Sequence, residues 1–129
     1  LIWSNQVDPA RANEINLSRE NVSPPIMTLS SIEKINFAKY LTDNNIVMYS
    51  AYWCPHCNDQ KQLFGKKAVE ELLIVECAKD GKNNQYKLCQ EKGIEGFPSW
   101  EINNQIYSGT MSLNELAKMT NYDGDINFE

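Results

Sequence analysis

The feature that most constrains this chain is a pair of cysteines with two residues between them, Cys54-Pro55-His56-Cys57. Residues 46–51, just before the pair, form a short and mostly apolar run, which predicts a buried strand. Pro55 suits the first position of a helix, because the amide hydrogen that proline lacks has no partner there. We therefore expect both cysteines in the first turn of a helix that runs toward Leu72 and bends at Gly65.

This placement of the cysteines favours redox chemistry. The amides and the dipole at a helix N-terminus stabilise a thiolate, and the C-x-x-C spacing allows two sulfurs to form a disulfide. We predict that Cys54 is the exposed attacking sulfur and that Cys57, one turn further in, resolves the mixed disulfide. A protonated His56 would add positive charge beside Cys54, and a thiolate stabilised in this way makes the disulfide form a stronger oxidant.

Other interpretations of the motif have to be weighed against this one. C-x-x-C also occurs in structural disulfides and in zinc or copper sites, and His56 could be a plain exposed turn residue. A metal chaperone usually adds a distant His or Met ligand, and His56 is the only histidine, so we expect no metal. A docking module without redox activity usually lacks one cysteine, whereas both are present here. A reductase or an isomerase would use the same chemistry and differ in reduction potential.

The second pair of cysteines, Cys77 and Cys89, carries no mark of a reactive thiol. Four cysteines alone permit three connectivities, but an even number fits an oxidising compartment. We predict a structural Cys77–Cys89 disulfide, which would stabilise the fold by roughly 3 kcal/mol. The alternative is a second redox relay.

The composition excludes few classes of protein. A length of 129 residues suits one domain, and a net charge of −5 argues against a nucleic-acid partner.

Residues 1–27, rich in Asn, Ser and Pro, are predicted to be a linker, followed by a domain at 28–122 and a tail at 123–129. The apolar patterns predict an α/β fold with a mixed central sheet. The expected elements are a helix capped by Ser30 and Glu33, strands at 46–51 and 72–77, a helix at 85–92, a hairpin around Asn103-Asn104, and a helix capped by Ser112 and Glu115.

A second motif, Gly93-Ile94-Glu95-Gly96-Phe97-Pro98-Ser99, is similar to the thioredoxin-fold loop that ends in a cis-proline. The resemblance implies that Pro98 packs against the active-site cysteines and that the backbone at Gly96 and Phe97 pairs with an extended substrate segment. Phe97 would then set specificity, and Trp53 would complete an apolar rim around the sulfur. Both aromatic residues could instead be plain core residues, as we expect of Trp100.

Further segments extend the resemblance over nearly the whole predicted domain. Together with the two motifs they resemble the thioredoxin-like domain at the C-terminus of vitamin K epoxide reductase homologues in cyanobacteria and plant plastids. The segments are Gln60-Lys61-Gln62-Leu63-Phe64-Gly65, Glu76-Cys77, Asp80-Gly81, Leu88-Cys89, Trp100-Glu101-Ile102 and Ser108-Gly109-Thr110-Met111-Ser112-Leu113.

This resemblance implies a place in an electron relay. The domain would form disulfides in exported client proteins and pass the electrons to a membrane-embedded domain, in the same polypeptide, that reduces a quinone. It would act in the periplasm or the thylakoid lumen as a monomer, without a cofactor of its own, and Leu1-Ile2-Trp3 would be the exit of the last spanning helix. One position departs from cytosolic thioredoxins, which have a buried Asp where this chain has Met48. Proton transfer must then depend on water, His56 or a group of a partner.

Overall fold

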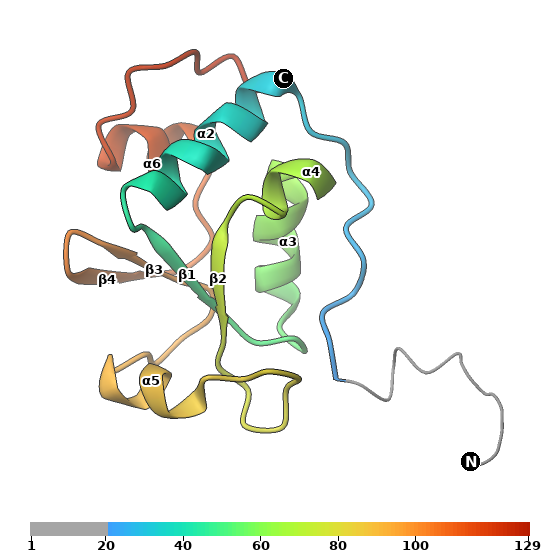
Figure 1. The fold of residues 1–129 in the computed structure, drawn as a ribbon, viewed down its shortest axis with the longest axis vertical. Helices are drawn as coiled ribbons and strands as arrows, with labels where there is room; N and C mark the ends of the chain where they lie inside the picture. Colours follow the sequence, from blue (N-terminus) through green and yellow to red (C-terminus); the bar gives the residue numbers. More distant parts are fainter. Residues whose placement is uncertain (1–20) are drawn as a thin grey trace, which may run out of the picture.

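The computed structural model describes residues 21–129, so Leu1-Ile2-Trp3 and most of the predicted linker lie outside the described residues. Helices and strands alternate as the sequence predicts, with bounds that differ by a residue or two (Figure 1). In the described part of the chain, no helix is long and apolar enough to cross a membrane. The elements are α2 (Ile32–Asp43), β1 (Val47–Ser50), α3 (Pro55–Phe64), α4 (Lys66–Val69), β2 (Leu73–Glu76), α5 (Tyr86–Glu91), β3 (Ser99–Ile102), β4 (Gln105–Ser108) and α6 (Leu113–Met119).

The four strands form one mixed sheet in the order β2-β1-β3-β4, which confirms the predicted α/β class. Strands β1 and β2 are parallel, because α3 and α4 carry the chain back between them. Strand β3 runs antiparallel to β1 and pairs with β4 in a hairpin. Asn103 and Asn104 form the predicted turn with φ angles of 52° and 67°, a left-handed conformation that asparagine tolerates.

The sheet separates two apolar clusters, since successive residues of a strand point to opposite faces. Met48 lies in the main core with Phe37 of α2, Phe64 of α3 and Trp100 of β3. Tyr49, the next residue of β1, lies in a smaller cluster with Cys77 and Cys89. The active-site helix α3 therefore packs on one face of the sheet, and the Cys77–Cys89 pair lies on the other.

The first helix begins one residue later than predicted. Its N-cap is Ser31, whose hydroxyl accepts from the Lys34 amide at 3.2 Å, so the predicted cap at Ser30 is wrong. The Ser30 hydroxyl instead donates to the Phe64 carbonyl and accepts from the Ala68 amide, both at 2.9 Å. Ser30 thus ties the start of α2 to the junction of α3 and α4.

Gly65 divides the chain after the cysteines into α3 and α4, where the sequence analysis expects a bend in one helix running toward Leu72. The Gly65 φ of 91° disfavours a side chain, and a Cβ there would lie 2.4 Å from the Leu29 carbonyl oxygen. The predicted capping box of the last helix is confirmed, because the Ser112 hydroxyl and the Glu115 carboxylate each accept a backbone amide. At the chain's end, Phe128 packs against the main core.

Candidate active site

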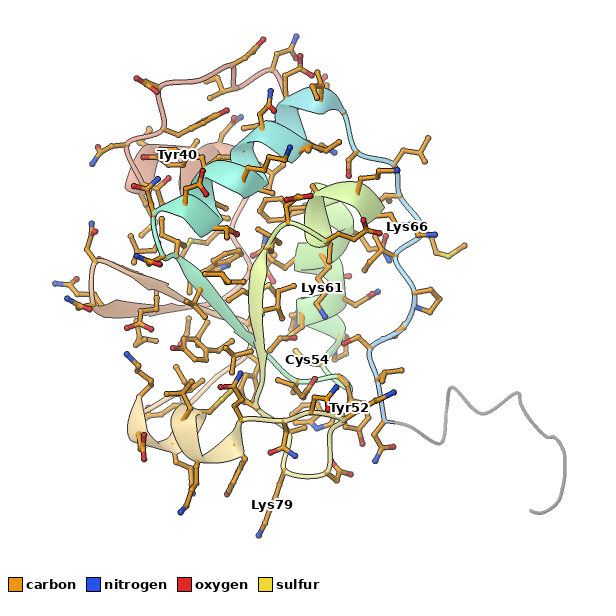
Figure 2. The ribbon with its side chains drawn as sticks, in the orientation of Figure 1. Tyr40, Tyr52, Cys54, Lys61, Lys66 and Lys79 are labelled. Atoms are coloured by element: carbon orange, nitrogen blue, oxygen red, sulfur yellow. A yellow bond between two sulfur atoms is a disulfide. The ribbon has the colours of Figure 1, made fainter. Side chains whose placement is uncertain are left out.

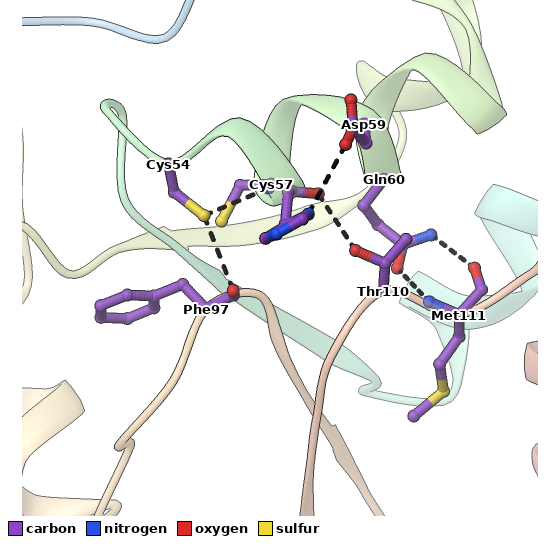
Figure 3. Close-up of polar contacts among 8 residues, drawn as sticks. Cys54, Cys57, Asp59, Gln60, Phe97, Thr110 and Met111 are labelled. Atoms are coloured by element: carbon purple, nitrogen blue, oxygen red, sulfur yellow. Dashed lines mark hydrogen bonds and ion pairs between the residues drawn. The ribbon is translucent and has the colours of Figure 1, made fainter.

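Cys54 and Cys57 lie at the start of α3, where the sequence places them (Figure 3). Cys54 is the N-cap, and its sulfur accepts from the Cys57 amide at 3.2 Å. Pro55 occupies the first turn, as its missing donor requires. Both thiols are free and both are buried, with Cys54 7% and Cys57 1% exposed, so the prediction of an exposed Cys54 is wrong although Cys54 is the more accessible of the two. The more accessible sulfur is therefore also the one that the helix N-terminus stabilises as a thiolate.

The second motif lies directly against this sulfur. The Phe97–Pro98 peptide bond is cis, and Pro98 is fully buried. The Cys54 sulfur lies 3.6 Å from the Phe97 carbonyl oxygen, which Figure 3 shows at the tip of the loop. Gly96 precedes them, and its carbonyl accepts from the Ser99 hydroxyl at 2.6 Å, which holds the loop in place. The structure thus brings together the two motifs that the sequence places far apart.

Two aromatic side chains lie next to each other beside Cys54. Trp53 and Phe97 meet edge to face with their ring centroids 5.9 Å apart. Trp53 is 58% exposed, which is unusual for so large an apolar side chain. An exposed Trp53 beside a half-buried Phe97, next to a reactive sulfur, offers an apolar surface to a peptide. Trp100, by contrast, is completely buried, as expected for a core residue.

His56 lies on the exposed side of the helix. Its Nδ1 is 3.6 Å from an Asp59 carboxylate oxygen, and the two side chains are 75% and 66% exposed. Its carbonyl accepts from the Thr110 hydroxyl at 3.3 Å. A protonated imidazole here forms an ion pair with Asp59, a residue that the sequence analysis did not single out although it lies three positions further along the helix.

Buried polar residues that the sequence analysis missed lie behind the cysteines. Burial raises the pKa of the Cys57 thiol to about 12, and the nearby Ser50 hydroxyl and Ala51 backbone oppose this rise. Lys61 is only 7% exposed, and burial lowers the pKa of its ammonium group. Lys61 follows Cys57 by one helical turn, a spacing that places both on one face of α3 and could have identified it.

Gln60 connects the active-site helix to the rest of the core. Its side-chain oxygen accepts from the Trp100 indole at 3.1 Å and from the Met111 amide at 2.9 Å, while its nitrogen donates to the Met111 carbonyl at 2.9 Å. Figure 3 shows the hydrogen bonds between Gln60 and Met111 near the cysteines. Since Gln60 is fully buried and all three bonds reach residues outside α3, it fixes the orientation of the helix that carries the thiols.

The other cysteine pair forms a disulfide. Cys77 and Cys89 are joined with a Cα–Cα distance of 5.7 Å, and both are buried. The bond links the end of β2 to α5 on the face of the sheet opposite α3. Phe97 packs against this cluster as well as against the main core. A purely structural role for the disulfide stays a prediction.

The geometry described above permits thiol–disulfide exchange. A substrate segment can approach Cys54 past Trp53 and the Phe97–Pro98 loop. Cys57 lies next to the attacked sulfur, where it can resolve a mixed disulfide. Residues 21–129 hold no group of three or more His, Cys, Asp or Glu side chains placed to share an ion.

Comparison with known proteins places the chain in a family. Residues 28–121 match the thioredoxin family. The chain is 41% identical over 120 residues to the thiol-disulfide oxidoreductase LTO1 of Arabidopsis thaliana, a match that covers 91% of this chain and 31% of that relative. It is 29% identical over 106 residues to the protein disulfide-isomerase of Saccharomyces cerevisiae, with 79% of this chain and 20% of that relative covered.

These relatives support the predicted class of chemistry, oxidoreduction at a cysteine pair. The chain spans less than a third of the length of either one. The family match includes the C-x-x-C motif, the cis-proline loop and the whole mixed sheet. The chain belongs to the thioredoxin family.

Proposed function

We propose that this domain is a thiol–disulfide oxidoreductase that forms disulfides in client proteins. The observation that carries the proposal is the position of Cys54, which caps α3 and lies 3.6 Å from the carbonyl before cis-Pro98. One sulfur is therefore stabilised as a thiolate and placed where an extended peptide can reach it. Similarity to LTO1 adds support, since that relative is named a thiol-disulfide oxidoreductase.

The reaction starts from the oxidised Cys54–Cys57 pair. A client thiolate attacks the Cys54 sulfur, the bond between the two cysteines breaks, and its electron pair goes to the Cys57 sulfur. A second client thiol, as its thiolate, then attacks the client sulfur of the mixed disulfide and releases Cys54. The helix N-terminus and the Cys57 amide stabilise the departing Cys54 thiolate. Two electrons have moved to the domain, and the client carries a new disulfide.

Client segments bind across the apolar surface beside Cys54. Trp53 and Phe97 contact apolar client side chains, and the backbone of Gly96 and Phe97 pairs with the extended client segment. This mode of binding recognises a main chain rather than one sequence, which suits an enzyme with many cysteine-containing clients. Trp53→Ala should therefore raise the client KM, and Ile126→Ala, which removes another exposed apolar side chain, serves as the control.

The electrons go on to a membrane-embedded domain of the vitamin K epoxide reductase type, which reduces a quinone. In this arrangement the thioredoxin-like domain is a monomer without a cofactor of its own, and it acts in the periplasm or the thylakoid lumen. Support comes from the motif resemblance and from 41% identity to LTO1 over 91% of the chain. The reading frame upstream of Leu1 tests the fusion: hydrophobic helices with another C-x-x-C pair support it, and their absence refutes it.

The reduction potential tests the direction of the reaction. Equilibration of the domain with a glutathione buffer should give a potential well above the roughly −270 mV of cytosolic thioredoxin. A potential at or below that value would instead identify a reductase. The similarity to a protein disulfide-isomerase makes isomerisation the second candidate. Faster recovery of activity by a scrambled disulfide protein than by its reduced form would favour the isomerase.

A further inference from the structure

The structure raises the question of how the buried Cys57 sulfur exists as a thiolate. In the oxidising direction Cys57 is the leaving sulfur, and in the reverse direction it attacks. Burial raises the pKa of the Cys57 thiol to about 12, so the neutral thiol is strongly favoured at neutral pH. His56 is poorly placed to help, because its ring pairs with Asp59 on the exposed side of the helix.

Ser50 is the first group that faces Cys57. It ends β1 on the same face of the sheet as Met48, the face that α3 covers. Its side chain is fully buried, and its hydroxyl has no hydrogen-bond partner of ordinary geometry among the described residues. The hydroxyl nevertheless lies close enough to Cys57 to lower the pKa of that thiol. A buried donor without an acceptor, next to a sulfur that must become negative, is suited to the thiolate form of Cys57.

Lys61 is the second group. Its ammonium donates to the Ser23 hydroxyl at 2.9 Å, so the chain segment before α2 covers it. Figure 2 shows Lys61 extending from α3 above Cys54. After burial, the strongest influence on the pKa of Lys61 is the charge of Cys57, ahead of Glu76 and Cys54. A lysine buried to this extent is uncommon and needs negative charge nearby.

One carboxylate also faces this site. Glu76 of β2 is the strand partner of Ser50, and its side chain lies on the α3 face. Its carboxylate is already engaged, because one oxygen accepts from the Tyr52 amide at 3.1 Å and the Ala78 amide at 3.0 Å. The groups that bear or can bear charge and that act on the Lys61 ammonium are therefore Cys57, Glu76 and Cys54. Lys61 is the positive group among them.

We propose that the Lys61 charge and a hydrogen bond from the Ser50 hydroxyl together stabilise the thiolate of Cys57, an inference that rests on the proposed exchange reaction. When a client thiolate attacks Cys54, the Cys54–Cys57 bond breaks and its electron pair stays on the Cys57 sulfur. Ser50 and Lys61 hold this anion until it takes a proton from water. In the reverse direction the thiol gives its proton to water, and the stabilised thiolate attacks the mixed disulfide at Cys54.

Two rates test the proposal in the folded domain. The first is reduction of the oxidised pair by a dithiol peptide, and the second is release of glutathione from a mixed disulfide on Cys54, measured against pH. Lys61→Met should lower both rates about tenfold and displace the pH profile of glutathione release upward by about one pH unit. Ser50→Ala should lower both rates about threefold. Lys67→Met, which removes an exposed charge from α4, is the matched control and should change neither rate.

The outcomes separate this inference from the proposed function. Wild-type rates and an unshifted pH profile in both Lys61→Met and Ser50→Ala would overturn the inference and leave the oxidoreductase intact. Equal slowing by Lys67→Met would also overturn it, because a general loss of positive charge would then explain the effect. If the wild-type domain fails to react with dithiol peptides, the proposed function fails, and the release of glutathione by Cys57 still decides the roles of Ser50 and Lys61.

Discussion

Removal of the Cys77–Cys89 disulfide should destabilise the domain strongly and leave the chemistry at Cys54 almost unchanged. The bond closes a loop between residues 12 positions apart, and loop-closure entropy for a ring of that size amounts to about 3 kcal/mol. In a domain of this size such a loss lowers Tm by roughly 10–20 °C. Both sulfurs are buried, so alanine is the replacement that leaves no unpaired polar group.

The measurement is urea unfolding of the Cys77→Ala/Cys89→Ala variant under non-reducing conditions. It should be made in a background with Cys54 and Cys57 changed to alanine, so that only one disulfide differs between the two proteins. In the background that keeps Cys54 and Cys57, the variant should oxidise a dithiol peptide within about threefold of the wild-type rate, because the disulfide lies across the sheet from α3. Unchanged stability would refute the reasoning, and normal stability with lost electron transfer would identify a relay.

Four other perturbations test the active-site helix. Gln60→Leu leaves two buried donors without an acceptor and should lower the free energy of unfolding by about 2–4 kcal/mol in a urea titration. Gly65→Ala should cost about 2 kcal/mol or more in the same assay, because its φ is 91° and Leu29 leaves no room, whereas an unchanged midpoint would contradict the close approach. His56→Ala should lower the reduction potential against glutathione, and an unchanged potential would leave the helix N-terminus as the sole source of thiolate stabilisation. Since the folded reduced domain raises the pKa of Cys57 from 9.0 to about 12, its stability should fall as pH rises through this range, whereas the oxidised domain should show no such loss.

Local sequence signals were sufficient to predict much of the fold. The Ser112 and Glu115 capping box, the Asn103-Asn104 turn and the position of the break at Gly65 each depend on the conformational preferences of a few neighbouring residues. The first helix shows where such signals fail, because Ser30 and Ser31 are equally good caps by residue type. The choice between them depends on contacts of Ser30 with Phe64 and Ala68, which only the folded chain brings close.

The residues of the candidate site also fall into two groups, those that local sequence signals predict and those that depend on the folded chain. Cys54, Cys57 and the Phe97–Pro98 loop follow from motifs that can be recognised in the sequence. Ser50 and Lys61 do not, because a serine at the end of a strand and a lysine in a helix are ordinary in isolation. Their importance arises from burial beside Cys57, which depends on how α3 packs against β1. The sequence identifies the reacting sulfurs, and tertiary packing determines which other groups lie close enough to stabilise their thiolates.

Trapping of the mixed disulfide tests the central claim most directly. A client peptide with one activated disulfide is mixed with the Cys57→Ser and Cys54→Ser variants, and the covalent adduct is identified by mass spectrometry. The account predicts a stable adduct on Cys54 in Cys57→Ser, because Cys54 is the more exposed sulfur and caps α3. It predicts little or no adduct in Cys54→Ser, whose remaining active-site sulfur is 1% exposed. An adduct that forms only in Cys54→Ser would contradict the assignment of Cys54 as the reacting sulfur.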